Sequence, residues 1–388
     1  MEIKYYIAIC LLNLLPFNKA FSQENSSVPL QVPVHFSMQK ISAETYESVG
    51  VFDVNGDGKQ DLVSGGFWYP GPGYTKRFPV RDVKRTGEYY DDFFTLPLDV
   101  NGDGRLDFVA GGWFGGTIYW YENTGNFDKQ WPEHMIAQIG NLETARAWDV
   151  DGDGVMEIVP NNIEKPFRFY RLDLDARGKG KGTFTMHQLH ETQGHGLGFG
   201  DINKDGRNDF ILAGGWLEAP AKPLTETWKW HPEFKIDNAS VPILVVDLNK
   251  DGRNDLIAGN GHGYGLDWME QGTAGKWIRH SIDPYNSQFH TMAWIDITGD
   301  KIPELLTGKR FRAHNDGDDG AFDDYGLYYY QWDGQAFSKQ VVSFGPLGIG
   351  KGTGNYFEVA DLNADGRLDW VVAGKDGLSI FFNEGANK

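Results

Sequence analysis

The chain has 388 residues, a formal net charge of −18 and a single cysteine, Cys10. No basic stripe and no aromatic RNA-binding motif accompanies this acidity, so the composition excludes a nucleic-acid-binding protein. One cysteine cannot form a disulfide within the chain, which excludes a disulfide-stabilised scaffold.

The first segment predicts export. Residues 1–22 combine Lys4, an apolar run from Tyr5 to Leu15, and the small residues Ala20 and Ser22. This pattern is typical of a secretory signal, here cleaved near Gln23. We therefore expect a periplasmic or secreted protein. The apolar run is too short to span a bilayer and no later segment approaches that length, so we expect no membrane insertion.

An acidic pattern of nine residues recurs seven times after the signal. Its copies begin at Asp53, Asp99, Asp149, Asp201, Asp247, Asp296 and Asp361, at intervals of 46, 50, 52, 46, 49 and 65 residues. Short apolar runs flank each copy, and a period near fifty is typical of a four-stranded propeller blade. The sequence thus predicts an all-β, seven-bladed β-propeller over residues 23–388, as one domain and a monomer.

Oxygen-bearing side chains occupy positions 1, 3, 5 and 9 of the pattern, and glycine usually occupies position 6. This arrangement resembles the first half of a calcium-binding loop, so we expect structural calcium in the turns. The sixth copy departs from the pattern at Thr298, Lys301 and Pro303, which weakens the expectation there. The predicted ligands are Asp53, Asn55, Asp57, Asp61, Asp99, Asn101, Asp103, Asp107, Asp149, Asp151, Asp153, Glu157, Asp201, Asn203, Asp205, Asp209, Asp247, Asn249, Asp251, Asp255, Asp361, Asn363, Asp365 and Asp369.

The repeat resembles the FG-GAP or VCBS family of propeller blades, over about residues 44–386. The resemblance implies that each acidic turn joins the innermost strand of a blade to the second strand. Only two strands follow the last copy, at residues 370–374 and 378–383. We expect residues 33–41 to supply the fourth strand and to close the ring.

Polar residues recur at the opposite end of the inner strands. The position six residues before each first Asp lies about 20 Å from the turn along an extended strand. Its occupants are Glu47, Phe93, Glu143, His195, Val241, His290 and Asn355. We expect His195, His262, His290 and His314 to converge at this end, whereas His35, His134, His187 and His280 are expected on outermost strands.

The longest interval contains an additional loop, residues 308–326. It begins with Lys309, Arg310, Arg312 and His314 and continues with five aspartates. One interpretation is a solvated, charge-balanced loop or a further calcium site. The other is an anion-binding flap over the central funnel, the end of the ring where these polar residues gather. Three indoles that follow Gly-Gly, those of Trp68, Trp113 and Trp216, are predicted to stack on sugar rings.

Four segments resemble the propeller part of aldos-2-ulose dehydratase and its exported bacterial relatives. They are GHGLGFGDIN (194–203), GNGHGYGLDW (259–268), FHTMAWIDITGD (289–300) and TGKRFRAHNDG (307–317). The cupin domains of the fungal enzyme are absent from this sequence. The resemblance implies β-elimination of water from a carbohydrate, in degradation of an anionic, uronic-acid-containing glycan of the ulvan type.

The residue types suit that chemistry. A β-elimination needs a base, an acid and a group that stabilises an enolate. We assign catalysis to His195, His290, His314 and Arg310. Substrate binding is assigned to Glu143, His262, Lys309, Arg312, Trp68, Trp113 and Trp216. Glu143, His195 and His290 form a ligand set suited to zinc or manganese. The alternatives are a polysaccharide lyase, a non-catalytic glycan-binding propeller and a protein-interaction scaffold.

Overall fold

The structure is a computed structural model that describes residues 32–386. The predicted signal, residues 1–22, lies outside the described residues. Within residues 32–386 the strands form seven four-stranded antiparallel sheets, here called blades 1 to 7, and one two-stranded hairpin. The same part of the chain contains no helix long and apolar enough to cross a membrane.

The first four blades follow one another along the chain. Blade 1 contains β2 (Gly50–Phe52), β3 (Asp61–Ser64), β4 (Phe67–Tyr69) and β5 (Phe78–Pro79). Blade 2 contains β8 (Phe94–Leu98), β9 (Asp107–Gly111), β10 (Thr117–Tyr121) and β11 (Glu133–Gln138). Blade 3 contains β12 (Thr144–Trp148), β13 (Glu157–Asn161), β14 (Phe167–Leu174) and β15 (Gly180–His190). Blade 4 contains β16 (Leu197–Gly200), β17 (Asp209–Leu212), β18 (Gly215–Glu218) and β19 (Lys229–His231).

The remaining elements complete the ring. Blade 5 contains β20 (Leu244–Val246), β21 (Asp255–Gly259), β22 (Tyr264–Gln271) and β23 (Trp277–Ser287). Blade 6 contains β24 (Met292–Ile295), β25 (Glu304–Gly308), β26 (Tyr325–Trp332) and β27 (Phe337–Gly345). Blade 7 contains β28 (Phe357–Ala360), β29 (Asp369–Val372), β30 (Leu378–Ala386) and β1 (Val34–Ser42). Outside the blades lie β6 (Arg85–Thr86), β7 (Tyr89–Tyr90) and two short 3-10 helices, η1 (Thr273–Gly275) and η2 (Ala313–Asp316).

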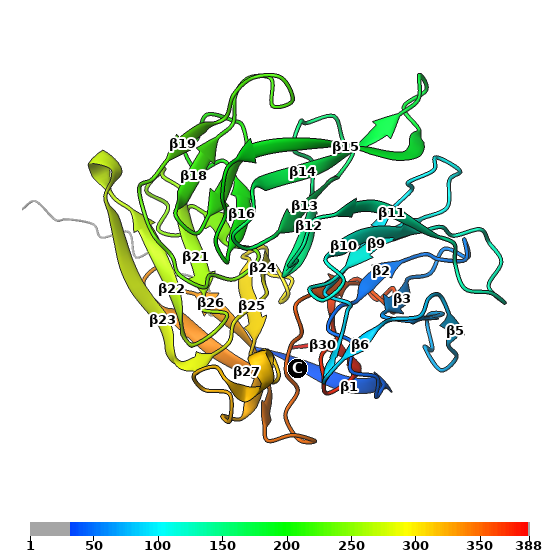
Figure 1. Ribbon diagram of the computed structural model, residues 1–388. Helices are drawn as coiled ribbons and strands as arrows, with labels where there is room; N and C mark the ends of the chain where they lie inside the picture. The colour runs from blue at the N-terminus through cyan, green and yellow to red at the C-terminus, as the bar shows by residue number, and fades with distance from the viewer. Residues whose placement is uncertain (1–31, 387–388) are drawn as a thin grey trace, which may run out of the picture. The chain divides into compact units, whose positions relative to one another are not determined.

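The blades follow one another around a ring (Figure 1). The innermost strands of neighbouring blades are in contact, as β2 is with β8 and with β28, and β16 is with β20. The predicted all-β, seven-bladed propeller is therefore confirmed.

The hydrophobic core lies between neighbouring blades. One cluster joins Phe94 and Val109 of blade 2 to Ile158 and Tyr170 of blade 3. The second strand of each blade supplies much of this core, and in β9 all five residues are buried. A strand that is buried on both faces needs a continuous apolar run, which explains the short runs that follow each acidic repeat.

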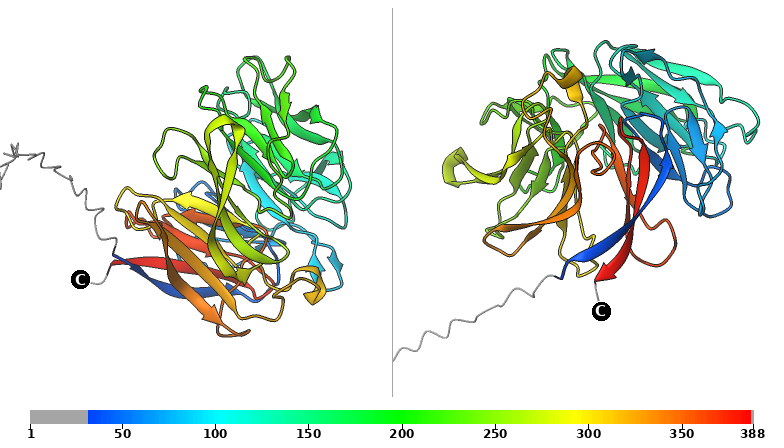
Figure 2. Two further views of the ribbon diagram at one scale, coloured as in Figure 1. Left: turned by 90° about the vertical axis from the view of Figure 1, so that its left-hand side faces the viewer. Right: turned by 90° about the horizontal axis from the view of Figure 1, so that it is seen from below.

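The N-terminal strand closes the ring as predicted. β1 pairs antiparallel with β30 from Val34 opposite Ala386 to Ser42 opposite Leu378. The two strands lie side by side in Figure 2, blue beside red. The Val34 amide also donates a hydrogen bond to the Tyr329 hydroxyl of blade 6, at 3.0 Å. Blade 7 is thus built from both ends of the chain.

Deletion of residues 33–41 is expected to destabilise the ring and cause aggregation, because it exposes the edge of β30 and the apolar face of blade 7. Size-exclusion chromatography and thermal melting measure both effects. The matched control deletes residues 23–31 and retains β1. A monomeric, equally stable protein without residues 33–41 would contradict the closure.

Candidate functional site

All seven residues at the predicted repeat position are buried: Glu47, Phe93, Glu143, His195, Val241, His290 and Asn355. They precede the inner strands, whereas the acidic turns follow those strands, so they lie at the opposite end of the ring from the turns. Contacts cross from blade to blade at this end. The Asn355 side chain of blade 7 donates to the Glu143 carbonyl of blade 3 at 3.2 Å.

Three histidines meet beside one carboxylate. The ring centroids of His195 and His262 are 4.5 Å apart, those of His262 and His290 are 4.7 Å apart, and those of His195 and His290 are 5.5 Å apart. Glu143 Oε1 lies 3.9 Å from His195 Nε2 and 3.6 Å from His290 Nε2. One ligand atom from each of the four residues lies within 4.8 Å of the others. We call these four residues the central cluster.

Neighbouring groups fix the tautomers of two of these histidines. His195 Nδ1 lies 2.7 Å from the Ala239 carbonyl oxygen, an acceptor, so Nδ1 carries the proton. His195 Nε2 is buried and has no hydrogen-bond partner among the described residues. His262 Nδ1 lies 3.1 Å from Asp318 Oδ2 and donates to it in the same way. A donated Nδ1 proton leaves Nε2 with a free lone pair, as in histidines that bind metals.

Arg310 lies at the centre of the polar network. Its Nε donates to Glu47 Oε2 at 2.8 Å, and its Nη1 donates to Glu143 Oε1 at 3.0 Å. Nη1 also lies 3.0 Å from His290 Nε2. A guanidinium cannot accept a hydrogen bond, so His290 Nε2 is the acceptor and Nδ1 carries the proton. His290 Nδ1 is buried without a partner among the described residues.

The charges of this network determine the protonation of its members. Burial, and then the Arg310 charge, keeps the pKa of His290 well below its ordinary value. Burial likewise lowers the pKa of His195, and it lowers that of His262 to about 4. Burial raises the pKa of Glu143, but Arg310 and nearby histidines outweigh that effect and the pKa lies below its ordinary value. The cluster therefore holds neutral imidazoles beside an ionised carboxylate near pH 7.

The loop 308–326 differs from the anion-binding flap we considered. Lys309 is buried, and its Nζ donates to Ser287 Oγ at 3.0 Å, to Gln288 Oε1 at 2.7 Å and to the Gly320 carbonyl. The assignment of Lys309 to substrate binding is thus corrected, because its three donors anchor the loop. Arg312 is part-exposed and pairs with Asp316 at 2.8 Å and with Glu88 at 3.3 Å.

Asp318 of the same loop holds two histidines at once. His262 and His314 stack with ring centroids 4.2 Å apart and ring planes 6° apart. Asp318 Oδ2 lies 3.1 Å from His262 Nδ1, and Oδ1 lies 2.9 Å from His314 Nδ1. The His314 side chain is 55% exposed, so this imidazole reaches solvent beside the central cluster. Sequence reasoning did not select Asp318, because five aspartates in one loop gave no means of choosing among them.

Sequence reasoning also omitted Glu47 from the candidate site. Glu47 occupies the repeat position of Glu143, and this equivalence was the signal that could have selected it. The hairpin β6–β7 was missed as well. Tyr89 of this hairpin accepts a hydrogen bond from the Asn315 amide at 3.1 Å, and its ring lies 3.4 Å from Lys375 Nζ of blade 7.

Two of the three predicted sugar-stacking indoles belong to the core. Trp68 and Trp216 are 3% and 5% exposed. Trp68 stacks on Phe78 and Trp216 on His231, with ring centroids 5.0 and 4.0 Å apart. Two-residue turns end the second strands early and place both indoles inside third strands, β4 and β18, where they pack within and between blades. Trp113 is part-buried in the turn between β9 and β10.

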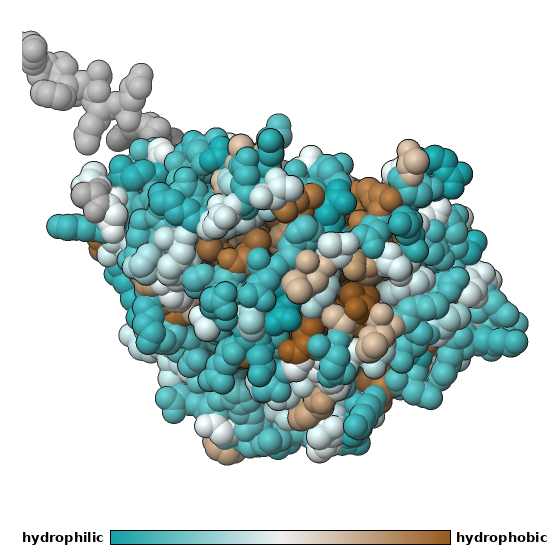
Figure 3. Space-filling model, turned by 45° about the horizontal axis from the view of Figure 1, so that its top comes forward, coloured by the Kyte–Doolittle hydropathy of each residue, from teal (hydrophilic) through white to brown (hydrophobic). Residues whose placement is uncertain are grey.

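A cavity of about 300 Å³ opens beside the central cluster on blade 4. His195, Gln193, Trp230 and Lys235 are among the residues that line it. Figure 3 shows a mostly hydrophilic surface with hydrophobic side chains grouped in the middle of the face in view. The cavity gives a ligand a route to His195.

The acidic turns share one backbone geometry. In the first turn, Asp53 accepts hydrogen bonds from the amides of Gly56 at 2.7 Å and Gly58 at 2.8 Å, and Asn55 Oδ1 accepts from Asp57 at 2.9 Å. The ninth-position carboxylate is buried in all seven turns and accepts from the amide seven residues before it. Burial raises the pKa of Asp61 and Asp107 to about 6 and that of Glu157 to about 8. A cation in the turn would offset this cost of burial.

Comparisons with known proteins agree with the fold. Residues 99–159 match the family described as FG-GAP-like repeat. Comparison with curated proteins gives no match, so the resemblance to aldos-2-ulose dehydratase stays a prediction.

Three solved structures illustrate the structural likeness. The structure of BBS1N in complex with ARL6DN is 13% identical with a TM-score of 0.51, over 89% of this chain and 95% of that one. An Agrocybe aegerita lectin specific for non-reducing terminal N-acetylglucosamine is 16% identical with a TM-score of 0.47, over 88% and 86%. Rhamnogalacturonan lyase YesW is 15% identical with a TM-score of 0.46, over 91% and 75%. The first supports the fold alone, and the other two support no further argument.

Removal of calcium is expected to lower the melting temperature appreciably, because a ligand that binds only the folded state stabilises it. The measurement is a melting curve with excess calcium-selective chelator, together with elemental analysis of the purified protein. Chelator saturated with calcium is the control. An unchanged curve and a protein free of calcium would refute a structural role for calcium.

Proposed function

We propose that this protein is an exported carbohydrate-active dehydratase that removes water by β-elimination from uronic-acid-containing oligosaccharides. One observation carries the proposal. Three neutral imidazoles and an ionised carboxylate, brought from blades 3, 4, 5 and 6, converge at one end of the ring. Two of their buried nitrogen atoms, His195 Nε2 and His290 Nδ1, have no hydrogen-bond partner among the described residues. Buried polar atoms without partners are rare in proteins, and a ligand would satisfy them.

The central cluster fits a divalent metal such as zinc or manganese. Zinc–nitrogen bonds of about 2.0–2.1 Å in a tetrahedral site separate the ligand atoms by about 3.4 Å. Glu143 Oε1 lies 3.6 and 3.9 Å from the Nε2 atoms of His290 and His195, close to that separation. His195, His262 and Glu143 would hold the ion, and His290 would join them in exchange for the hydrogen bond that its Nε2 accepts from Arg310. A bound ion there supplies positive charge that stabilises an enolate.

His314 is then the imidazole free to move a proton. In the elimination, its Nε2 takes the proton from the carbon next to the uronic carboxylate, and that electron pair forms the carbon–carbon double bond. The hydroxyl on the β-carbon leaves and takes the proton back from His314, which yields water. Asp318 holds His314 Nδ1 at 2.9 Å and so keeps Nε2 available.

Arg310 has a positioning role in this scheme. Its Nε and Nη1 donors are engaged by Glu47, Glu143 and His290. It orients Glu143 and keeps that carboxylate ionised. The catalytic assignment of Arg310 from the sequence therefore becomes a positioning role, without direct contact to an enolate.

Mass spectrometry of uronic oligosaccharides after incubation tests the reaction. The expected product has lost one water. A shortened product would instead indicate a polysaccharide lyase, in which a glycosidic oxygen leaves. Unchanged oligosaccharides that still bind would indicate a glycan-binding propeller.

Replacement of either His195 or His290 by Ala is expected to abolish turnover, with a loss of at least about 10²- to 10⁴-fold, while the melting temperature changes little. Turnover and melting curves are measured for each variant. His187→Ala is the matched control. His187 lies on β15, the outermost strand of blade 3, where it stacks on Phe169 at the opposite edge of the sheet from the inner strand β12. Parent-like turnover by both cluster variants would overturn the enzymatic proposal.

Replacement of Asp318 by Asn is expected to weaken zinc binding by about 10- to 100-fold, because the carboxylate that orients His262 is lost. Titration calorimetry with zinc and the visible spectrum of the cobalt-loaded protein report on the site without turnover. Asp319→Asn, an exposed neighbour, is the control. Equal zinc affinity in both variants would contradict the positioning role of Asp318.

A further inference from the structure

The surroundings of the central cluster are closed on one side. The hairpin β6–β7, which follows blade 1 in the chain, meets the loop 308–326 of blade 6 through the ion pair of Glu88 and Arg312. Lys375 of blade 7 joins them by contacts to Glu88 at 3.3 Å and to the Arg312 carbonyl. Side-chain contacts therefore connect this hairpin with blades 6 and 7.

Aromatic rings extend this closed side to blade 2. Tyr89 of the hairpin packs against Phe93 and Phe114, with ring centroids 6.4 and 5.5 Å apart. The Phe93 ring lies 5.5 Å from the Arg310 guanidinium carbon. These contacts form a wall of packed side chains beside the cluster.

On the blade 4 side of the cluster, the cavity that includes His195 is one of three neighbouring cavities. Three cavities lie along the junction of blades 4 and 5, and Lys235 lines all three. The innermost cavity contains His195. The next, of about 200 Å³, reaches Arg279 on β23, and the outermost, of about 570 Å³, reaches Trp277. We call this series of cavities the blade 4–5 groove.

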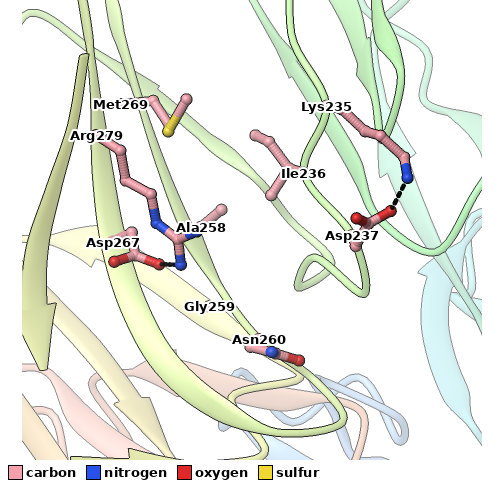
Figure 4. Close-up of a pocket in the computed structure, with 9 residues that line it drawn as sticks. All are labelled: Lys235, Ile236, Asp237, Ala258, Gly259, Asn260, Asp267, Met269 and Arg279. Carbon is pink, nitrogen blue, oxygen red and sulfur yellow. Dashed lines mark hydrogen bonds and ion pairs between the residues drawn. The ribbon is translucent and has the colours of Figure 1, made fainter. Parts of the chain in front are cut away.

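The groove offers charged side chains that can bind a ligand carboxylate. Figure 4 shows Arg279 paired with Asp267 across one wall and Lys235 paired with Asp237 on the facing loop. Both partners of the Lys235–Asp237 pair are exposed, at 75% and 72%, and such a pair contributes only about 0–1 kcal/mol, so a ligand carboxylate can replace Asp237 at little cost. The Asp267 side chain is only 14% exposed, so Arg279 keeps this partner and offers its other guanidinium donors to the ligand.

The lining also suits the rest of a sugar chain. Asn260 lies at one end of the second cavity and Met269 at the other, near Arg279 (Figure 4), while Phe234 and Trp277 line the third. Amides bind hydroxyl groups, and apolar and aromatic side chains cover sugar faces. The groove carries three basic and three acidic residues in a chain whose net charge is −18. It is therefore less repulsive to an acidic glycan than most of the surface.

We propose that the enzyme acts on the end of an acidic oligosaccharide. This proposal rests on the proposed function. The terminal sugar occupies the central cluster against the closed wall, and the following sugars extend along the blade 4–5 groove. Arg279 and Lys235 bind carboxylates of those following sugars, because a guanidinium binds a planar carboxylate through two hydrogen bonds.

The position of the double bond tests the chain-end assignment. Tandem mass spectrometry of the product from a long uronic oligosaccharide locates the dehydrated sugar. The expected product is unsaturated only in a terminal sugar. Dehydration of internal sugars would overturn the proposal, because an internal sugar at the cluster needs room for the chain on both sides.

The groove is tested separately with variants and chain length. Arg279→Ala and Lys235→Ala are each expected to raise KM about tenfold for long oligosaccharides and to leave KM for the shortest substrate unchanged. Arg177→Ala is the matched control, since Arg177 is an exposed arginine paired with Asp175 on blade 3. Equal KM values for all lengths in the parent and both variants would overturn the groove while leaving the reaction intact.

Binding data distinguish failure of the groove from failure of the proposed reaction. If the parent converts no oligosaccharide, calorimetry measures the affinity for short and long chains directly. Tighter binding of long chains that Arg279→Ala abolishes would support the groove and refute the dehydratase. Binding independent of length would overturn the groove.

Discussion

The pairing of Arg310 with Glu47 and Glu143 is the interaction on which the candidate site depends. All three side chains are nearly inaccessible to water, and they come from blades 6, 1 and 3. Removal of one partner from a buried ion pair costs about 3–5 kcal/mol, because the remaining charge has no compensation. The two carboxylates therefore need the guanidinium, and the guanidinium holds Glu143 Oε1 3.9 Å from His195 Nε2 and 3.6 Å from His290 Nε2. Folding of the ring and assembly of the cluster are coupled through this one side chain.

Each inner strand is fixed at both of its ends by polar groups rather than by apolar packing alone. At one end, the ninth-position carboxylate accepts hydrogen bonds from the backbone, as Asp61 does from Val54 at 3.0 Å and from Gly71 at 2.7 Å. At the other end, the inner strands lead into the Arg310 network. The hydrophobic clusters between blades supply free energy of folding, and the hydrophobic pattern together with the turns sets strand register. The polar contacts at the strand ends add hydrogen bonds that only the correct register can form.

The repeat made the fold predictable, and its limits explain what was missed. The pattern of nine residues, with carboxylates at its first and last positions, defines a turn and the strands on both sides of it, so blade number and the role of β1 followed directly. Contacts made by the hairpin β6–β7 and by the loop 308–326 could not be predicted in this way, because neither segment is part of the repeat. Lys309 and Arg310 are adjacent in sequence and point to different partners, one to Gly320 and one to Glu47. Residue type and position alone could not separate an anchor from a member of the cluster, and two-residue turns moved Trp68 and Trp216 into the core.

Histidines outside the cluster show how unusual the central ones are. His134, His231 and His280 each stack on a tryptophan of the neighbouring strand, at centroid distances of 4.2, 4.0 and 4.4 Å. Each also contacts a glutamate, at 3.0, 2.7 and 2.7 Å. In these three blades, each histidine therefore has a glutamate as its hydrogen-bond partner and a tryptophan as its stacking partner. His195 Nε2 and His290 Nδ1 are buried without such partners among the described residues. Each such atom costs about 1–3 kcal/mol of stability. A bound metal or a ligand donor would satisfy the lone pair of His195 Nε2, and a ligand acceptor would satisfy the N–H group of His290 Nδ1.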